Sequence, residues 1–111
     1  MRVESGNDAG ATEAYERVVE LDPDNAVANH DLGILAKKRN DWTEAGLRFE
    51  RALELKPDYT NAAYQLGIVR EQQGDNDAAI FLYEAVLKRD PENTRAAQRL
   101  ERLQALQDSP E

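Results

Sequence analysis

The side chains that most often carry catalysis or bind metals are scarce in this sequence. His30 is the one histidine, and the chain has no cysteine. A histidine pair, a catalytic triad, a disulfide or a cysteine-ligated metal site therefore cannot be built from its side chains. Carboxylates are plentiful, but nothing in the pattern places two of them in a dry pocket where their pKa values would separate. We expect no enzymatic activity, no catalytic residue, no cofactor and no metal.

Two features that look like sites have simpler interpretations. Asp22, Asp24 and Asn25 surround Pro23, yet they lack the ligand spacing and the central glycine of a calcium loop, which favours a turn. Trp42 follows an Asn-Asp pair at the expected start of a helix. We predict that its ring packs against neighbouring side chains and is not a ligand platform.

Length and charge narrow the class of protein. A chain of 111 residues has room for one domain, and with 41% hydrophobic and 32% charged residues it can form a core beneath a water-facing surface. Its 14 basic and 22 acidic residues give a net charge of −8, which argues against binding to nucleic acid or to an anionic membrane. No apolar run is long enough for a signal peptide or a membrane span. Together with the lack of cysteine, this favours a cytoplasmic protein.

The elements that position these residues follow from an internal repeat of 34 residues. Three prolines lie at this interval: Pro23, Pro57 and Pro91. The same interval relates Leu32-Gly33-Ile34 to Leu66-Gly67-Ile68. It also relates three pairs of alanine and aromatic residues: Ala11 with Tyr15, Ala45 with Phe49, and Ala79 with Tyr83. So many matches in one register indicate a repeat architecture.

Apolar residues recur at spacings of three and four, which predicts two helices in each period. Each proline ends a helix, since it lacks the N–H group that would continue one. The expected turns within a repeat are the pairs Gly6-Asn7, Asn40-Asp41 and Gly74-Asp75, because Gly or Asn accepts a left-handed conformation and Asn or Asp caps the next helix. Asn25, Tyr59 and Asn93 precede the helices that follow the prolines.

The 34-residue pattern resembles that of the tetratricopeptide repeat family, whose signature runs W-x2-L-G-x2-Y, A-x3-F and P. The small residues of the signature are present, whereas Asn29 and Ala63 stand where the first aromatic residue would be. The resemblance implies an all-α solenoid of antiparallel helix hairpins in a right-handed superhelix. We expect six helices in a partial repeat (1–25), two full repeats (26–59 and 60–93) and a capping helix (94–107). The partial repeat would keep the tail of a first helix at 1–5 and a second helix at 7–21.

In each full repeat, the two positions that hold a small residue are where the two helices should cross most closely. Gly33 with Ala45, and Gly67 with Ala79, would leave no room for a larger side chain. Tyr15, Phe49 and Tyr83 would fill the space between successive repeats. Glu101 stands at the position of the two glycines in the last helix, which suits a polar cap with nothing packed on that side.

The resemblance also implies that the first helix of each repeat lines a concave groove. The residues expected there are Val27, His30, Asp31, Ile34, Lys37, Lys38, Asn61, Tyr64, Gln65, Ile68, Glu71, Gln72, Arg95, Gln98, Arg99 and Arg102. This face carries five cations against two acids, while much of the remaining acid lies on second helices. We expect His30 to be exposed in the groove. A protein-interaction scaffold that binds an extended acidic peptide or a C-terminal carboxylate is the predicted function, the alternative being ordinary solvated helix faces.

Some family members bind chaperone C-termini through a clamp of Lys and Asn, then Asn, then Lys and Arg. The matching positions here hold His30 and Ile34, then Gln65, then Arg95 and Arg99, so only the last pair agrees. This favours a general affinity for carboxylates and counts against recognition of chaperone tails.

The start of the array leaves two further possibilities open. Without a complete first helix, a face that includes Ala11, Ala14 and Val18 would be uncovered. Either the natural protein continues upstream, or the chain self-associates through this end as a homo-oligomer. A third alternative is that the chain is a regulatory or targeting segment of a larger enzyme.

Overall fold

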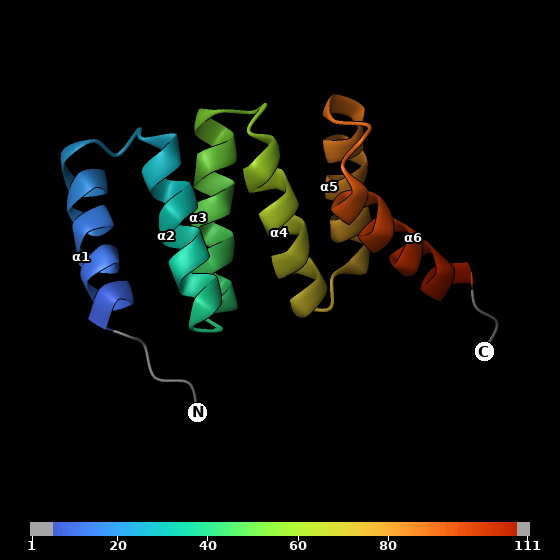
Figure 1. Ribbon diagram of the computed structural model, residues 1–111, viewed down its shortest axis with the longest axis horizontal. Coiled ribbons are helices and arrows are strands. Elements are labelled where there is room, and N and C mark those ends of the chain that lie inside the picture. Colours follow the sequence, from blue (N-terminus) through green and yellow to red (C-terminus); the bar gives the residue numbers. More distant parts are fainter. Residues whose placement is uncertain (1–5, 109–111) are drawn as a thin grey trace.

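The computed structural model describes residues 6–108, and within that range it contains six α-helices and no β-strand. Their bounds are α1 (Gly6–Leu21), α2 (Ala26–Lys38), α3 (Trp42–Leu55), α4 (Thr60–Gln72), α5 (Asn76–Arg89) and α6 (Thr94–Asp108). The helices stand in one row in chain order, and successive helices run in opposite directions (Figure 1). The predicted helix tail at residues 1–5 lies outside the described range. The all-α repeat fold is confirmed.

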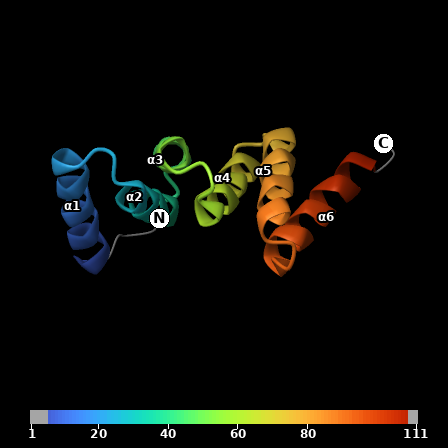
Figure 2. The same cartoon turned by 90° about the horizontal axis from the view of Figure 1, so that it is seen from above.

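Contacts between helices are mainly contacts between neighbours in the sequence. The hairpins α2/α3 and α4/α5 are the most extensive pairs, and α1/α2, α3/α4 and α5/α6 join the row together, with a smaller contact between α2 and α4. The molecule measures 48 × 34 × 20 Å, with α1 and α6 at opposite ends (Figure 2). This elongated shape is that of a short stack, in which each unit touches only the next.

Two of the three predicted turns within repeats are confirmed. Asn40 and Gly74 have φ values of 62° and 82°, the left-handed conformation that reverses the chain after a helix. Asp41 and Asp75 then cap α3 and α5 by accepting hydrogen bonds from backbone N–H groups three residues on. The predicted turn at Gly6-Asn7 is wrong, because both residues belong to the first turn of α1. Gly and Asn are tolerated in a first turn, where backbone N–H groups have no partner within the helix, so residue types alone do not separate the two cases.

The turns at the prolines are also built as expected. Asn25 and Asn93 each accept a hydrogen bond from the backbone N–H three residues on, at 2.9 and 3.0 Å. Tyr59, at the equivalent position, makes no such side-chain bond. The region around Pro23 is a turn between helices, in agreement with the sequence.

The helix crossings lie at the predicted glycines. A Cβ atom built on Gly33 would be 2.6 Å from Cε1 of Phe49, and one built on Gly67 would be 2.5 Å from Cε1 of Tyr83. Both rings are fully buried and belong to clusters that join successive repeats. Tyr15, the third member of the series, is only half-buried because α1 is at the end of the row. Its hydroxyl interacts with Asp31, and this hydrogen bond, followed by the negative charge, raises the pKa of Tyr15.

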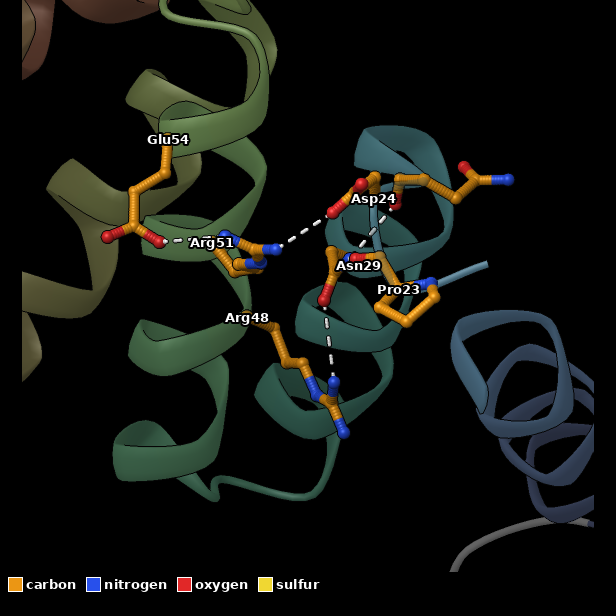
Figure 3. Close-up of polar contacts among 7 residues, drawn as sticks. Pro23, Asp24, Asn29, Arg48, Arg51 and Glu54 are labelled. Atoms are coloured by element: carbon orange, nitrogen blue, oxygen red, sulfur yellow. Dashed lines mark hydrogen bonds and ion pairs between the residues drawn. The ribbon is translucent and has the colours of Figure 1, made fainter. Parts of the chain in front are cut away.

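Asn29 replaces the first aromatic residue of the signature and is the one fully buried polar side chain of the described core. Its Nδ2 donates to the carbonyl oxygens of Pro23 and Asn25, at 3.4 and 3.0 Å, and its Oδ1 accepts from Nη1 of Arg48 on α3 at 3.4 Å (Figure 3). Nearby, Arg51 of α3 pairs with Asp24 at 3.0 Å. Polar contacts therefore join α3 to the turn before α2, where an aromatic ring would otherwise pack. Trp42 is partly buried against the core, as predicted.

Both ends of the row expose the surfaces that the sequence predicts. On α1, Ala14 is exposed and Val18 is 37% exposed, as predicted, whereas Ala11 is half-buried; Leu21, which the prediction did not include, is 88% exposed. On α6, Glu101 is exposed. Self-association through the face of α1 stays a prediction.

Candidate functional site: a groove along α2, α4 and α6

Two adjoining hollows lie along the helices that begin each repeat. The first, about 370 Å³, lies beside α4 and α6, and the second, about 280 Å³, extends from α6 past α4 to α2. They share Tyr64 and Arg95, and we call them together the groove. The lining residues are His30, Asn61, Tyr64, Gln65, Asn93, Arg95, Gln98, Arg99 and Arg102. Eight of these were expected from the sequence; Asn93 was missed, since it had been assigned to a turn.

His30 lines the groove but is not the exposed residue that the sequence predicts. Its side chain is only 14% exposed, because the ring stacks on Tyr59 at 5.1 Å and meets Phe49 at 5.6 Å between ring centroids. Nδ1 lies 3.0 Å from Oδ1 of Asp31. Nε2 is buried without a hydrogen-bond partner in the described part of the chain. Proximity to two aromatic rings, which come from the next helix and the next turn, explains why helical periodicity did not reveal this burial.

A carboxylate from α4 organises the arginines of α6. Glu71, whose side chain is 10% exposed, accepts hydrogen bonds from Nη1 of Arg99 at 3.1 Å, from Nη2 of Arg102 at 3.0 Å and from the hydroxyl of Tyr83. Nε of Arg99 also donates to the hydroxyl of Tyr64 at 3.2 Å. From the sequence, Tyr64, Glu71, Arg99 and Arg102 were expected on the groove face and Tyr83 between repeats, and nothing in the pattern indicated that they would pair.

Arg95 differs from the other exposed cation of the groove, Arg102, which is bonded to Glu71. Arg95 is exposed at the border of the two hollows, and in residues 6–108 it forms no ion pair. The other predicted cations are engaged: Lys37 donates to Oε1 of Gln65 at 2.7 Å, and Lys38 faces Asp8 of α1 at 3.6 Å. Burial, and then the charge of Arg99, lowers the pKa of Lys37. The basic character of the groove is thus concentrated at α6.

A family model for the tetratricopeptide repeat matches residues 30–94, which is more than half of the chain. The chain belongs to the tetratricopeptide repeat family. No significant match was found among curated protein sequences.

Three solved structures, one of them a tetratricopeptide repeat domain, superpose closely on this one. MamA is 31% identical with a TM-score of 0.84, over 88% of this chain and 57% of its own. The first repeat domain of Spaghetti (RPAP3), solved with the HSP90 peptide SRMEEVD, is 24% identical with a TM-score of 0.89, over 94% and 82%. The O-GlcNAc transferase of Thermobaculum terrenum is 28% identical with a TM-score of 0.81, over 88% of this chain and 19% of the enzyme. This chain therefore spans a little over half of MamA and a small part of the transferase.

Eight of the residues that the sequence assigns to the tetratricopeptide repeat groove do not line its two hollows: Val27, Asp31, Ile34, Lys37, Lys38, Ile68, Glu71 and Gln72. Ile34 packs against the core, and Ile68 is half-buried. Lys37 and Glu71 reach the groove only through their contacts with Gln65 and with the arginines. Lys38, directed toward α1, is farther away.

Glu71 should make the stability of this tetratricopeptide repeat domain depend on pH. Burial alone would raise its pKa, but hydrogen bonds from Tyr83, Arg99 and Arg102 outweigh burial and hold the pKa below its ordinary value of 4.5. A carboxyl with a lowered pKa in the folded state adds stability above its unfolded pKa, and this is lost as the pH falls through the folded value. We therefore expect Glu71→Gln to lower the melting temperature most at neutral pH.

The measurement is a set of thermal unfolding curves of both proteins from neutral pH to about pH 3. The difference between them should shrink as the medium becomes more acidic than about pH 4.5. A difference that stays constant, or grows, in acid would mean that the ionised carboxylate of Glu71 does not stabilise the fold.

Outside the groove, a more apolar hollow of about 510 Å³ lies between α5 and α6 and is lined by Phe81, Glu84, Ala85, Leu87, Lys88 and Leu100. In the part of the chain that the structure describes, no group of three or more His, Asp or Glu residues could hold a metal ion. None of the six helices combines the length and the apolar character that crossing a membrane requires.

Proposed function

We propose that this chain is a protein-interaction scaffold that binds an extended acidic peptide, or a peptide's C-terminal carboxylate, in the groove. The observation that carries the proposal is Arg95, an exposed guanidinium that forms no ion pair with the described residues 6–108, at the border of two adjoining hollows. A guanidinium in this setting binds a carboxylate through two parallel hydrogen bonds.

The rest of the lining supports a peptide ligand. The side-chain amides of Asn61, Gln65 and Asn93 lie around Arg95, and their N–H groups can donate to carbonyl oxygens of a peptide backbone. The Spaghetti domain binds a peptide with three acidic residues, which agrees with a groove for acidic chains. The chaperone clamp of that kind is incomplete here, because His30 is packed between aromatic rings and Ile34 lies against the core. The proposal is therefore for acidic peptides in general.

Arg95→Ala should weaken the binding of an acidic peptide about tenfold, because one charge-assisted pair of hydrogen bonds is lost. The measurement is fluorescence anisotropy with a labelled acidic peptide, with free or amidated C-terminus, at low and at high salt. A larger loss with the free C-terminus would indicate that Arg95 holds the terminal carboxylate.

Arg17→Ala is the matched control, since Arg17 is an exposed arginine of α1 outside the groove. It removes the same charge and should have little effect, above all at high salt, where distant charges are screened. Equal losses for the two variants would show that the peptide responds only to net charge and that the groove is not its binding site.

A further inference from the structure

Glu71 provides the α6 arginines with an anion from within the protein. Its Oε2 accepts from Arg99 and from the hydroxyl of Tyr83, and its Oε1 accepts from Arg102. This is the set of contacts that a ligand carboxylate would seek at the same arginines. Because the side chain is 10% exposed and lies on α4, the anion is fixed in place by the fold.

Some of the N–H donors of Arg99 are therefore already hydrogen-bonded within the protein in the absence of a ligand. A guanidinium binds a carboxylate side-on through two donors on neighbouring nitrogens, and it has two such edges. Nε donates to Tyr64 and Nη1 donates to Glu71, so each edge of Arg99 has one donor engaged. Arg102 has one nitrogen on Glu71, although its side chain is 61% exposed. Arg95 has no such constraint within the described chain.

The repeat itself does not require a carboxylate at this position. The equivalent residues, 34 positions before and after Glu71, are Lys37 and Ala105. A cation and a small apolar residue are thus both compatible with the same place in the helix hairpin. Among these three equivalent positions, only the one in the repeat at residues 60–93 holds a carboxylate.

We propose that Glu71 is a specificity-determining residue of the groove, which competes with acidic ligands for Arg99 and Arg102 and so restricts strong binding to a single carboxylate at Arg95. This inference rests on the proposed function. A ligand with one carboxylate binds at Arg95 and leaves Glu71 in place. A ligand with many carboxylates has to displace Glu71 before it can also bind Arg99 and Arg102.

Glu71→Gln tests this by removing the charge while keeping the size of the side chain. Two probes are needed: an amidated hexaglutamate peptide, and an alanine-rich peptide whose C-terminus is its only carboxylate. We expect the variant to bind hexaglutamate about tenfold more tightly and the single-carboxylate peptide less than about threefold more tightly. Glu84→Gln, on the exposed surface of α5, makes the same change of charge away from the groove and should alter neither affinity by more than about twofold.

A second comparison separates release of the arginines from a general gain of positive charge. Arg102→Ala should have a small effect on hexaglutamate binding in the natural chain and a large one in the presence of Glu71→Gln, because Arg102 becomes available only when Glu71 is neutral. Circular dichroism checks that each variant is folded. If Glu71→Gln does not fold, Glu71→Ala, which copies the equivalent Ala105, replaces it in the same comparison.

The outcomes distinguish this inference from the function on which it rests. If Arg95→Ala weakens binding while neither Glu71 variant tightens the binding of hexaglutamate, the groove binds acidic peptides but Glu71 is not a competitor. If Glu71→Gln and Glu84→Gln tighten binding equally, only net charge matters and the inference is overturned. If no groove variant changes the affinity for either probe, the proposed function and the inference both fail.

Discussion

Replacing Gly67 with alanine should lower the free energy of unfolding by about 2 kcal/mol, within the range for overpacked cores. The added Cβ would lie 2.5 Å from Cε1 and 2.9 Å from Cζ of Tyr83, closer than real contacts allow. The ring cannot easily move aside, because it is fully buried and its hydroxyl is bonded to Glu71. Either the helices of the hairpin separate or the ring leaves its site, and both lose packing.

Two other glycines provide matched controls for this substitution. Gly10 lies exposed in α1 with nothing within 4 Å of a built Cβ, so Gly10→Ala should increase stability by about 0.5 to 1 kcal/mol through its effect on helix propensity. A Cβ on Gly46 would be 3.5 Å from Val69 and Arg70, an ordinary contact, so Gly46→Ala in the interior of α3 should also increase stability, by a similar amount. The measurement is equilibrium unfolding in urea. A Gly67→Ala variant as stable as Gly10→Ala would disprove the close crossing of α4 and α5.

Phe49→Ala should lower the free energy of unfolding by more, about 3 to 5 kcal/mol, which is a large part of the stability of a domain of this size. The ring is fully buried, covers Gly33 and belongs to the cluster that joins α2 and α3 to α4. Its removal leaves a cavity at the junction of two repeats and takes away one of the rings that pack on His30. We expect a lower urea midpoint and, since His30 lines the groove, weaker peptide binding.

The other phenylalanine of the chain is the control. Phe81 is 72% exposed on α5, so Phe81→Ala should change stability by about 0.5 kcal/mol or less. Similar losses for the two variants would contradict the assignment of Phe49 to the core and Phe81 to the surface.

The fold could be predicted from the sequence because its determinants are local and periodic. The glycines at the crossings, the aromatic rings that cover them and the prolines at the turns recur at one interval, and each acts on residues a few positions away or on the adjacent helix. Asn40 and Gly74 are of the residue types that tolerate the left-handed conformation observed. Gly6-Asn7 has similar residue types but lies inside a helix, which only the backbone reveals.

The groove could be predicted only as a set of positions. Periodicity assigns His30, Glu71 and Arg99 to one face of their helices, but it does not say which side chains meet across helices. Glu71 binds arginines 28 and 31 residues away, and His30 is covered by Tyr59 and Phe49. Such contacts depend on the angle between helices and on rotamers. The buried Asn29 was missed for a similar reason, since its partners are carbonyl groups of a turn and Arg48 of the next helix.

The row of helices also has a consequence for the kinetics of folding. Apart from the contacts of α2 and of the α6 arginines with α4, the substantial contacts join helices that are consecutive in the chain, so little loop-closure entropy is lost when each pair forms. Folding can therefore begin at any helix hairpin and extend to the helices on either side. The terminal helices α1 and α6 each pack on only one consecutive helix, so their amide hydrogens should exchange with solvent sooner than those of α3 and α4.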